Sequence, residues 1–163
     1  MLRLSSREKG FTLTEMLVVV AIVAILAGLA LPLAKTAVKR EKEIQLRRNL
    51  RLIREAIDVY KKLADENKIE TEDDSEGYPP DLETLVKGVE VLVDEGEGDG
   101  DSSRKIQKFL RRIPKDPMTN SYDWGLRAYE DDPDSSSWGG DNVYDVYTRS
   151  PGTALDGSKY RDW

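Results

Sequence analysis

The segment Lys9-Gly10-Phe11-Thr12-Leu13-Thr14-Glu15-Met16, together with the apolar run that follows it to Ala34, decides the fold of this chain. Residues 16–34 are 19 consecutive positions without a charged side chain, and most of them are Leu, Val, Ile or Ala. A helix of that length is about 28 Å long, close to the thickness of the hydrocarbon core of a bilayer. The sequence therefore predicts a helix over residues 11–34 that is buried either in a membrane or against copies of itself.

The junction Gly10-Phe11-Thr12-Leu13-Thr14-Glu15-Met16-Leu17, preceded by a short basic leader, resembles the processing site of type IV pilins and type II secretion pseudopilins. The resemblance implies that residues 1–10 are a prepilin leader peptide. It also implies that a membrane-bound prepilin peptidase cuts between Gly10 and Phe11 and then N-methylates Phe11. Glu15 matches the acidic residue that the family carries four positions after the methylated one.

Glu15 is a carboxylate at the edge of the apolar run, where an ionised group is costly unless it has a partner. Cleavage after Gly10 would create an ammonium group at Phe11, one helical turn away. The amine of a neighbouring copy, shifted along the helix axis, could pair with Glu15 and set the stagger of a filament. Such a pair acts on register more than on net stability, so Glu15 is the predicted filament-assembly residue.

Two other interpretations of the N-terminal segment stay open. A cleaved secretory signal peptide would use Arg3, Arg7 and Lys9 as its basic region and would end near Gly28 or a later small residue. A plain single-span anchor fits the length of the apolar run. Neither interpretation explains Glu15, because both kinds of segment have only apolar residues at such a position. We therefore favour the processing site.

The composition excludes several classes of function. The chain has 163 residues, a net charge of −6, no cysteine and no histidine. Because no basic stripe dominates the soluble part, nucleic acid is a poor partner. The lack of cysteine excludes disulfides and separates the chain from many type IV pilins, which often carry one. Without histidine or cysteine no nucleophile–base pair is suggested, so we do not expect an enzyme.

Gly28 and Pro32 mark the weak point of the apolar helix. The ring of Pro32 clashes with the carbonyl of Gly28, and its missing N–H removes one hydrogen bond. Glycine is itself a weak helix former. We therefore expect a kink or unwinding over residues 28–32, and the resemblance implies that this part loses regular structure when a filament assembles.

Residues 35–68 continue as an amphipathic helix that contains no proline or glycine. Its apolar positions alternate between spacings of four and three, which is typical of one buried helix face. These positions are Leu46, Leu50, Ile53, Ile57, Tyr60 and Ala64. The opposite face carries Arg47, Arg48, Arg51, Arg54, Lys61 and Lys62. This half of the helix is predicted to be a spine for the rest of the chain.

The remaining residues, 69–163, are predicted to form a small head. Residues 80–86 indicate a short helix, and residues 106–113 a short helical or irregular segment. Residues 122–128 and 143–148 indicate two strands, which cannot bury their own faces and therefore need the spine. The predicted fold class is α+β: a long N-terminal helix packed against a head with a short antiparallel sheet, as in the pilin fold that the resemblance implies.

Parts of the head also resemble the major pseudopilin of type II secretion. Phe109-Leu110-Arg111-Arg112-Ile113-Pro114-Lys115-Asp116-Pro117 is similar to a leucine-proline-lysine-aspartate-proline stretch of that family. Arg161-Asp162-Trp163 is similar to its aspartate- or asparagine-tryptophan end. The acidic stretch 94–103 looks like an insertion and is expected to be mobile. Lys115-Asp116, beside two prolines, is interpreted as a structural turn.

The resemblance implies a subunit of a type II secretion filament that works as a piston or scaffold. It would sit in the bacterial inner membrane by a single span, with its head in the periplasm. The implied partners are further copies of the chain, the prepilin peptidase, the inner-membrane assembly platform and minor pseudopilins. Two alternatives stay open: a type IV pilus subunit, and a membrane-anchored periplasmic binding protein.

The major pseudopilins carry calcium in the loop after their last strands, so the resemblance raises calcium as a cofactor. Calcium prefers several oxygen ligands, carboxylates among them. The matching loop, residues 148–158, offers one carboxylate, Asp156, with Asp162 further on. The acidic runs 94–101 and 131–134 do not fit the twelve-residue calcium loop. We therefore expect no cofactor, with calcium in the 148–158 loop as the alternative.

Overall fold

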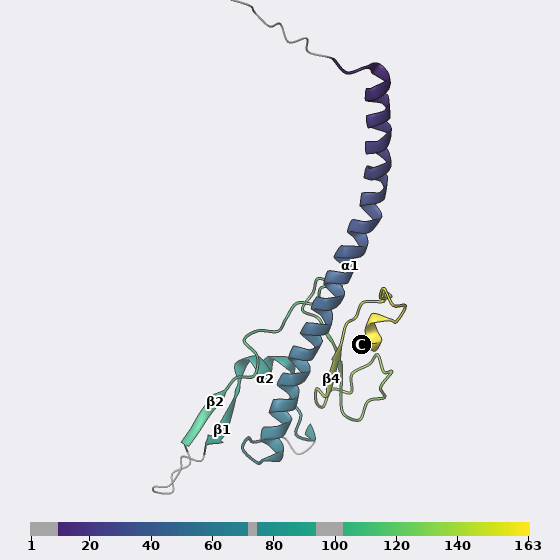
Figure 1. Ribbon diagram of the computed structural model, residues 1–163. Coiled ribbons are helices and arrows are strands. Elements are labelled where there is room, and N and C mark those ends of the chain that lie inside the picture. The colour runs from purple at the N-terminus through teal and green to yellow at the C-terminus, as the bar shows by residue number, and fades with distance from the viewer. Residues whose placement is uncertain (1–9, 72–74, 94–102) are drawn as a thin grey trace, which may run out of the picture. The chain divides into compact units, whose positions relative to one another are not determined.

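One long helix and a series of short elements make up the computed structural model (Figure 1). The structure describes residues 10–71, 75–93 and 103–163, and the side chains of residues 29–33 lie outside that description. In chain order the elements are α1 (Leu13–Asp65), α2 (Leu82–Lys87), β1 (Val89–Val93), β2 (Ser103–Gln107), β3 (Gly125–Arg127), β4 (Asp145–Tyr147) and the 3-10 helix η2 (Tyr160–Asp162). The chain divides into two units, residues 1–39 and 40–163.

The first unit contains the N-terminal part of α1. Thr12 caps this helix, because its hydroxyl accepts a hydrogen bond from the backbone N–H of Glu15 at 3.2 Å. Glu15 lies in the first turn, where a negative charge interacts favourably with the helix dipole. The apolar side chains of this part are exposed in the single chain; they include Leu17, Val20, Val23, Ile25 and Leu26. Such a surface needs lipid or protein to cover it.

The apolar half of α1 is helical at both residues of the expected weak point, Gly28 and Pro32. The expected unwinding concerns an assembled filament and stays a prediction, and the Pro32 side chain lies outside the described residues. Within the described part of the chain, no helix combines the length and the apolar character needed to cross a membrane.

In the second unit, α1 carries the core of the head. The predicted stripe is confirmed, because Leu46, Leu50, Ile53, Ile57 and Tyr60 are all buried. The side chains that share their cluster come from α2, β1, β4 and the connecting segments; they include Leu85, Val91, Leu110, Trp124, Val143 and Val146. Each fully buried aliphatic side chain stabilises the fold by roughly 1.5–3 kcal/mol. Apolar burial therefore holds the head to its spine.

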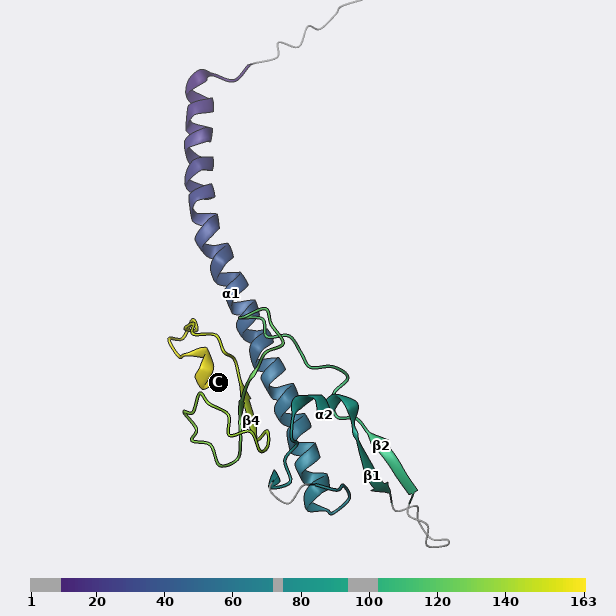
Figure 2. The ribbon, with the colours of Figure 1, turned by 180° about the vertical axis from the view of Figure 1, so that it is seen from behind.

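The elements of the head lie on two sides of this part of α1. Figures 1 and 2 show α2 with the β1–β2 hairpin on one side and β4 with the C-terminal segment on the other. The short helix expected at residues 80–86 is confirmed as α2, which begins after Asp81. The carboxylate of Asp81 accepts a hydrogen bond from the backbone N–H of Thr84 at 2.6 Å and so caps the helix.

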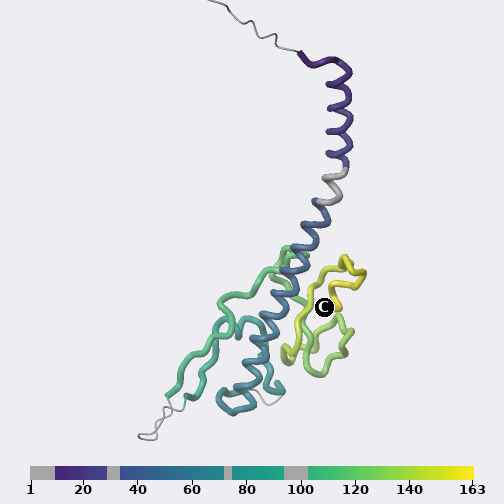
Figure 3. The backbone as a smooth tube through the Cα atoms, viewed as in Figure 1, coloured from purple at the N-terminus to yellow at the C-terminus, as the bar shows by residue number. Residues whose placement is uncertain are grey.

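The sheets are smaller and more numerous than the sequence predicts. The strands β3 and β4 confirm the two expected strands at shorter length and pair antiparallel, with Gly125 opposite Tyr147. An added Cβ at Gly125 would lie 2.3 Å from the Tyr147 ring, so only glycine lets the strands approach this closely. Figure 3 shows that most of the backbone between β2 and η2 is irregular.

A second antiparallel pair, β1 with β2, was not predicted. Residues 106–113, expected to be helical or irregular, belong to β2 up to Gln107 and are irregular from residue 108 on. Val89 lies opposite Gln107, and Val93 lies opposite Ser103. The alternation of Val89-Glu90-Val91-Leu92-Val93 is a strand signal, but its partner β2 is mostly polar and exposed. The connection between these strands, residues 94–102, lies outside the described residues, as does the mobility expected for it.

Candidate functional site

The junction between Gly10 and Phe11 is open to solvent. Both residues precede α1, and Phe11 is 73% exposed. A Cβ added at Gly10 would meet no described atom within 4 Å. The fold of the chain therefore gives no reason for glycine at this position. A need for glycine would have to come from a protein that binds the junction, and an exposed peptide bond ahead of a helix is open to such a protein.

Glu15 is exposed in the single chain, and it has no ion pair with any described residue. Within the part of the chain that the structure describes, the positive field next to Glu15 comes from the helix N-terminus. In the uncut chain the nitrogen of Phe11 is an amide and carries no charge. Glu15 is thus an acidic group, next to an exposed apolar surface, that lacks a cationic partner within its own described chain.

Comparison with known proteins agrees with this geometry. A family model described as "Prokaryotic N-terminal methylation motif" matches residues 5–31, which include Gly10, Phe11 and Glu15. The "Type II secretion system core protein G" of Pseudomonas aeruginosa is 28% identical over 148 residues, covering 86% of this chain and 94% of the relative. These matches support a likeness to the major pseudopilins of type II secretion.

Two further relatives of this chain carry the same name, "Type II secretion system core protein G". The protein of Vibrio cholerae is 27% identical over 118 residues, covering 72% of this chain and 70% of the relative. That of Escherichia coli is 28% identical over 123 residues and covers 74% of each. No solved structure matches the chain. The long helix and small α+β head agree with the pilin fold, and the relatives support a pseudopilin function in type II secretion.

The head contains a buried carboxylate that sequence reasoning missed. Glu43 lies on α1, is only 9% exposed, and accepts hydrogen bonds from the Leu155 backbone N–H and the Tyr160 hydroxyl, both at 2.9 Å. A buried charge is tolerated only when such donors replace water. The sequence does contain a sign of this burial, because Glu43 lies three positions before Leu46 and so continues the buried face of the helix.

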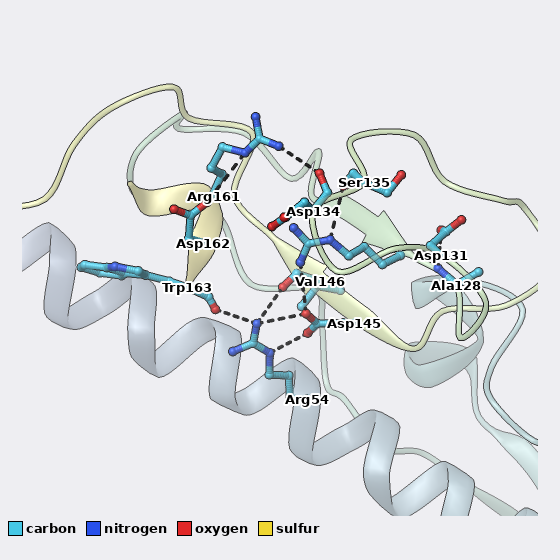
Figure 4. A network of polar contacts seen from close by, with 11 residues as sticks. Arg54, Ala128, Asp131, Asp134, Ser135, Asp145, Val146, Arg161, Asp162 and Trp163 are labelled. Atoms are coloured by element: carbon cyan, nitrogen blue, oxygen red, sulfur yellow. Dashed lines mark hydrogen bonds and ion pairs between the residues drawn. The ribbon is translucent and has the colours of Figure 1, made fainter. Parts of the chain in front are cut away.

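Arg54 also connects α1 to the C-terminal part of the head (Figure 4). Its guanidinium donates to the Asp145 carboxylate at 2.7 Å, to the Val146 carbonyl at 3.2 Å and to the Trp163 carbonyl at 2.7 Å. The sequence placed Arg54 on the outer face of the helix, and this is wrong, because its side chain is only 37% exposed. The planar guanidinium can serve three acceptors at once, which suits it to fasten a strand and a tail to one helix.

The loop at residues 148–158 does not fit a calcium ion. Both oxygens of Asp156 are engaged: one accepts hydrogen bonds from the backbone N–H and hydroxyl of Ser158, and the other faces Arg47 at 3.4 Å. The Ser158 donors lower the pKa of Asp156, and Arg47 lowers it further. The Arg47 guanidinium also lies 4.0 Å from the centre of the Trp163 ring. Among the described residues, no three acidic, histidine or cysteine side chains come together to hold a metal.

Another buried carboxylate, Asp116, organises the turn expected at Lys115-Asp116, and that interpretation is confirmed. Asp116 is fully buried. One carboxylate oxygen accepts from the Met118 backbone N–H at 2.8 Å, and the other accepts from the hydroxyls of Thr119 and Thr148. No described cation lies within ion-pair distance of it, so its charge depends on neutral donors alone. The turn is therefore joined to the segment just after β4.

The hydrogen bond from the Tyr160 hydroxyl to the Glu43 carboxylate predicts that the folded head loses stability at high pH. Burial, and then the hydrogen bond and charge of Glu43, raise the pKa of Tyr160 from 10.0 to about 12. Since the folded state binds this proton more tightly, the contribution is complete below pH 10 and is lost as the pH rises from 10 to 12. We expect the unfolding free energy to fall by on the order of 2 kcal/mol through this group.

The measurement is denaturant unfolding of the full chain in mild detergent at pH 9, 10, 11 and 12. Tyr160→Phe should be less stable than the parent at pH 9 and should fall less steeply above pH 10. Tyr129→Phe, at an exposed tyrosine of the head, is the matched control and should follow the parent. Equal slopes for Tyr160→Phe and the parent would contradict the assignment.

Proposed function

We propose that this chain is a pseudopilin that is cut between Gly10 and Phe11, methylated on the new amine of Phe11, and polymerised into a filament that serves protein secretion as a piston or scaffold. The observation that carries the proposal is the pairing of an open junction with an exposed apolar helix. The described fold does not require glycine at the junction. The helix that follows has an exposed apolar surface that needs lipid or other copies of the chain to cover it. Glu15 lies between the two and has no cationic partner among the residues that the structure describes.

The two environments of that helix define the working cycle that we propose. Before assembly the apolar segment is held in the bacterial inner membrane, and during assembly it moves from lipid into contact with the same segment of other copies. The prepilin peptidase, the assembly platform and minor pseudopilins are the partners such a cycle requires. The role is structural and not enzymatic: the head contributes packing surfaces and a spine, and its buried carboxylates serve hydrogen bonds within the fold.

Processing is tested at Gly10. Gly10→Leu is expected to leave the chain at precursor mass, because a large side chain before the cut obstructs the peptidase. Gly28→Ala is the matched control, since it also replaces a glycine but lies away from the junction, and it should be cut normally. Mass spectrometry of protein from the native host should give a parent chain that begins at N-methyl-Phe11. A mature chain beginning near Lys35 would instead mean a cleaved signal peptide.

Orientation is a separate prediction, because two rules disagree. Basic residues number three in the leader (Arg3, Arg7 and Lys9) and eight from Lys35 to Arg54. The positive-inside rule alone would keep the head in the cytoplasm. We expect the head in the periplasm, because the peptidase acts on the leader at the cytoplasmic side. Protease added to spheroplasts should digest the head, and complete protection of the head would show that the charge rule prevails.

A further inference from the structure

The outward face of α1 in the head unit carries an apolar row that the described chain leaves about half exposed. Ile44, Leu52 and Val59 are 49%, 46% and 49% exposed. They are eight and seven residues apart, so at 100° per residue they lie within about 80° of one another on the helix. The same helix buries its opposite stripe completely, so these exposed aliphatic side chains are a second, separate surface of the spine.

Two arginines stand within this row. Arg48 and Arg51 lie between Ile44 and Leu52, are exposed, and have no carboxylate of a described residue within 4 Å. Their neighbours Arg47 and Arg54 differ, because both are committed to the fold by the contacts described above. We call the five residues Ile44, Arg48, Arg51, Leu52 and Val59 the spine patch. It combines aliphatic side chains with two arginines; exposed Glu55 lies on the same side of the helix, so this surface has a net charge of +1.

The same unit carries a surface of opposite character between β3 and β4. Residues 128–144 contain no lysine or arginine. Their exposed acidic residues Glu130, Asp132, Asp134 and Asp141 form no side-chain ion pair with any described residue. Among them stand the exposed rings of Tyr129, Trp138 and Tyr144. We call these seven residues the loop patch.

The loop patch is held in shape by its own hydrogen bonds. The Trp138 ring N–H donates to the Asn142 carbonyl at 2.7 Å, and the Asn142 side chain, 2% exposed, accepts from the Tyr129 backbone N–H at 2.9 Å. Asp131 accepts from the backbone N–H groups of Ala128 and Gly139 at 2.7 and 3.1 Å. Tyr129 and Tyr144 also pack edge to face. A surface fixed in this way loses little entropy on binding.

We propose that the spine patch of one copy docks on the loop patch of a second copy. The two patches are complementary. The arginines of the spine patch would contact the carboxylates and aromatic rings of the loop patch, the groups to which guanidinium binds best. The aliphatic side chains would pack on the faces of the rings. The surfaces differ from each other, so the contact is head-to-tail. Such a contact continues from copy to copy and builds an open filament unless its rotation closes a ring.

This contact would join neighbouring subunits in the filament described under the proposed function, and the inference rests on that function. It places an ionic interface between heads, in addition to whatever the apolar helices contribute. Because the charges are exposed before docking, they steer the encounter and lose strength as salt rises. The interface sets which neighbour a head accepts, and it is independent of the Phe11–Glu15 pair.

The first test uses the absence of cysteine from the chain. Arg51→Cys and Asp134→Cys, made in two separate full-length chains and expressed together in cells that polymerise the parent, are expected to give a disulfide-linked dimer on mild oxidation. Neither variant alone should give one. Glu90→Cys is the matched control in place of Asp134→Cys, because it also replaces an exposed acidic residue of the head. Equal cross-linking with the control, or none with Asp134→Cys, would overturn the docking contact.

The second test exchanges charges. Arg48→Glu with Arg51→Glu, and separately Asp132→Lys with Asp134→Lys, should each reduce sheared filament at least about tenfold, while the chain carrying all four changes should recover most of it. Lys105→Glu with Lys108→Glu alters the net charge as the arginine pair does, at exposed sites outside both patches, and should assemble normally.

The outcomes separate the two proposals. If the parent and both reversed variants polymerise equally, the docking contact is wrong and the proposed function stands. If all four changes together fail to restore filament and the cysteine pair does not cross-link, the contact is likewise wrong. If the parent itself forms no filament in a host that carries the secretion machinery, the proposed function fails and the contact with it.

Discussion

Replacing Glu15 by Gln is expected to give a subunit that is cut, inserted and folded but does not polymerise. The amide keeps the size and a hydrogen-bonding group, and it removes the charge. During assembly the incoming Phe11 amine would then enter an apolar setting without a counter-ion. Breaking one side of a buried ion pair costs on the order of 3–5 kcal/mol, far more than removing both sides. At about 1.4 kcal/mol per factor of ten, assembly should fall by two to three orders of magnitude.

The measurement is the yield of sheared filament beside the mass of the membrane-bound subunit. Cleavage at Gly10 should persist, because the peptidase reads the junction. Glu15→Leu should enter the membrane at least as well as the parent and should also fail to assemble, which separates loss of charge from loss of insertion. Glu41→Gln, at an exposed glutamate further along α1, is the matched control and should assemble normally. Normal filament from either Glu15 variant would show that the carboxylate is not an assembly contact.

Asp116→Ala is expected to destabilise the head by about 3 kcal/mol or more. The alanine removes a fully buried carboxylate and leaves the Met118 backbone N–H and the hydroxyls of Thr119 and Thr148 without their acceptor. A buried donor left unpaired costs roughly 1–3 kcal/mol, and here several lose their partner at once. The turn and the segment after β4 should therefore separate well before the core stripe does.

Thermal unfolding of the full chain in mild detergent, followed by near-ultraviolet circular dichroism, measures this loss. For a domain of this size the midpoint should fall by roughly 6–12 °C. Asp123→Ala, at an exposed aspartate close by in the chain, is the control and should remain within about 0.5 kcal/mol of the parent. A midpoint for Asp116→Ala within 2 °C of the parent would mean that water or rearranged neighbours satisfy the three donors.

The parts of the fold that sequence patterns predicted are those with local signals. The spine stripe from Leu46 to Tyr60 repeats at helical spacing, and α2 follows a capping aspartate, so each could be recognised within a few residues. The β1–β2 hairpin was not predicted, because β2 has no alternation of apolar and polar residues and can be recognised only from its pairing with β1. A strand that pairs at an exposed edge leaves little trace in its own residues.

The candidate site divides in the same way. Gly10, Phe11 and Glu15 lie within six residues of one another, and their combination is a local pattern. Glu43 and Arg54 gained their roles from partners 91 to 117 positions away. No spacing rule could have selected those partners, because the contacts exist only once the chain has returned to the spine. Sequence reasoning therefore placed both residues on a helix correctly and could not say what they bind.

These returning contacts also govern the order in which the head can form. Glu43 and Arg47 lack their partners until residues 155–160 have been synthesised, and Arg54 lacks its full set until residue 163, although the helix that carries them is made early. Contacts between residues so distant in sequence form slowly, because loop closure precedes any gain from the contact. A newly made head therefore passes through a stage in which the apolar stripe of the spine is uncovered. In that interval the uncovered apolar side chains leave the chain open to aggregation and to proteolysis.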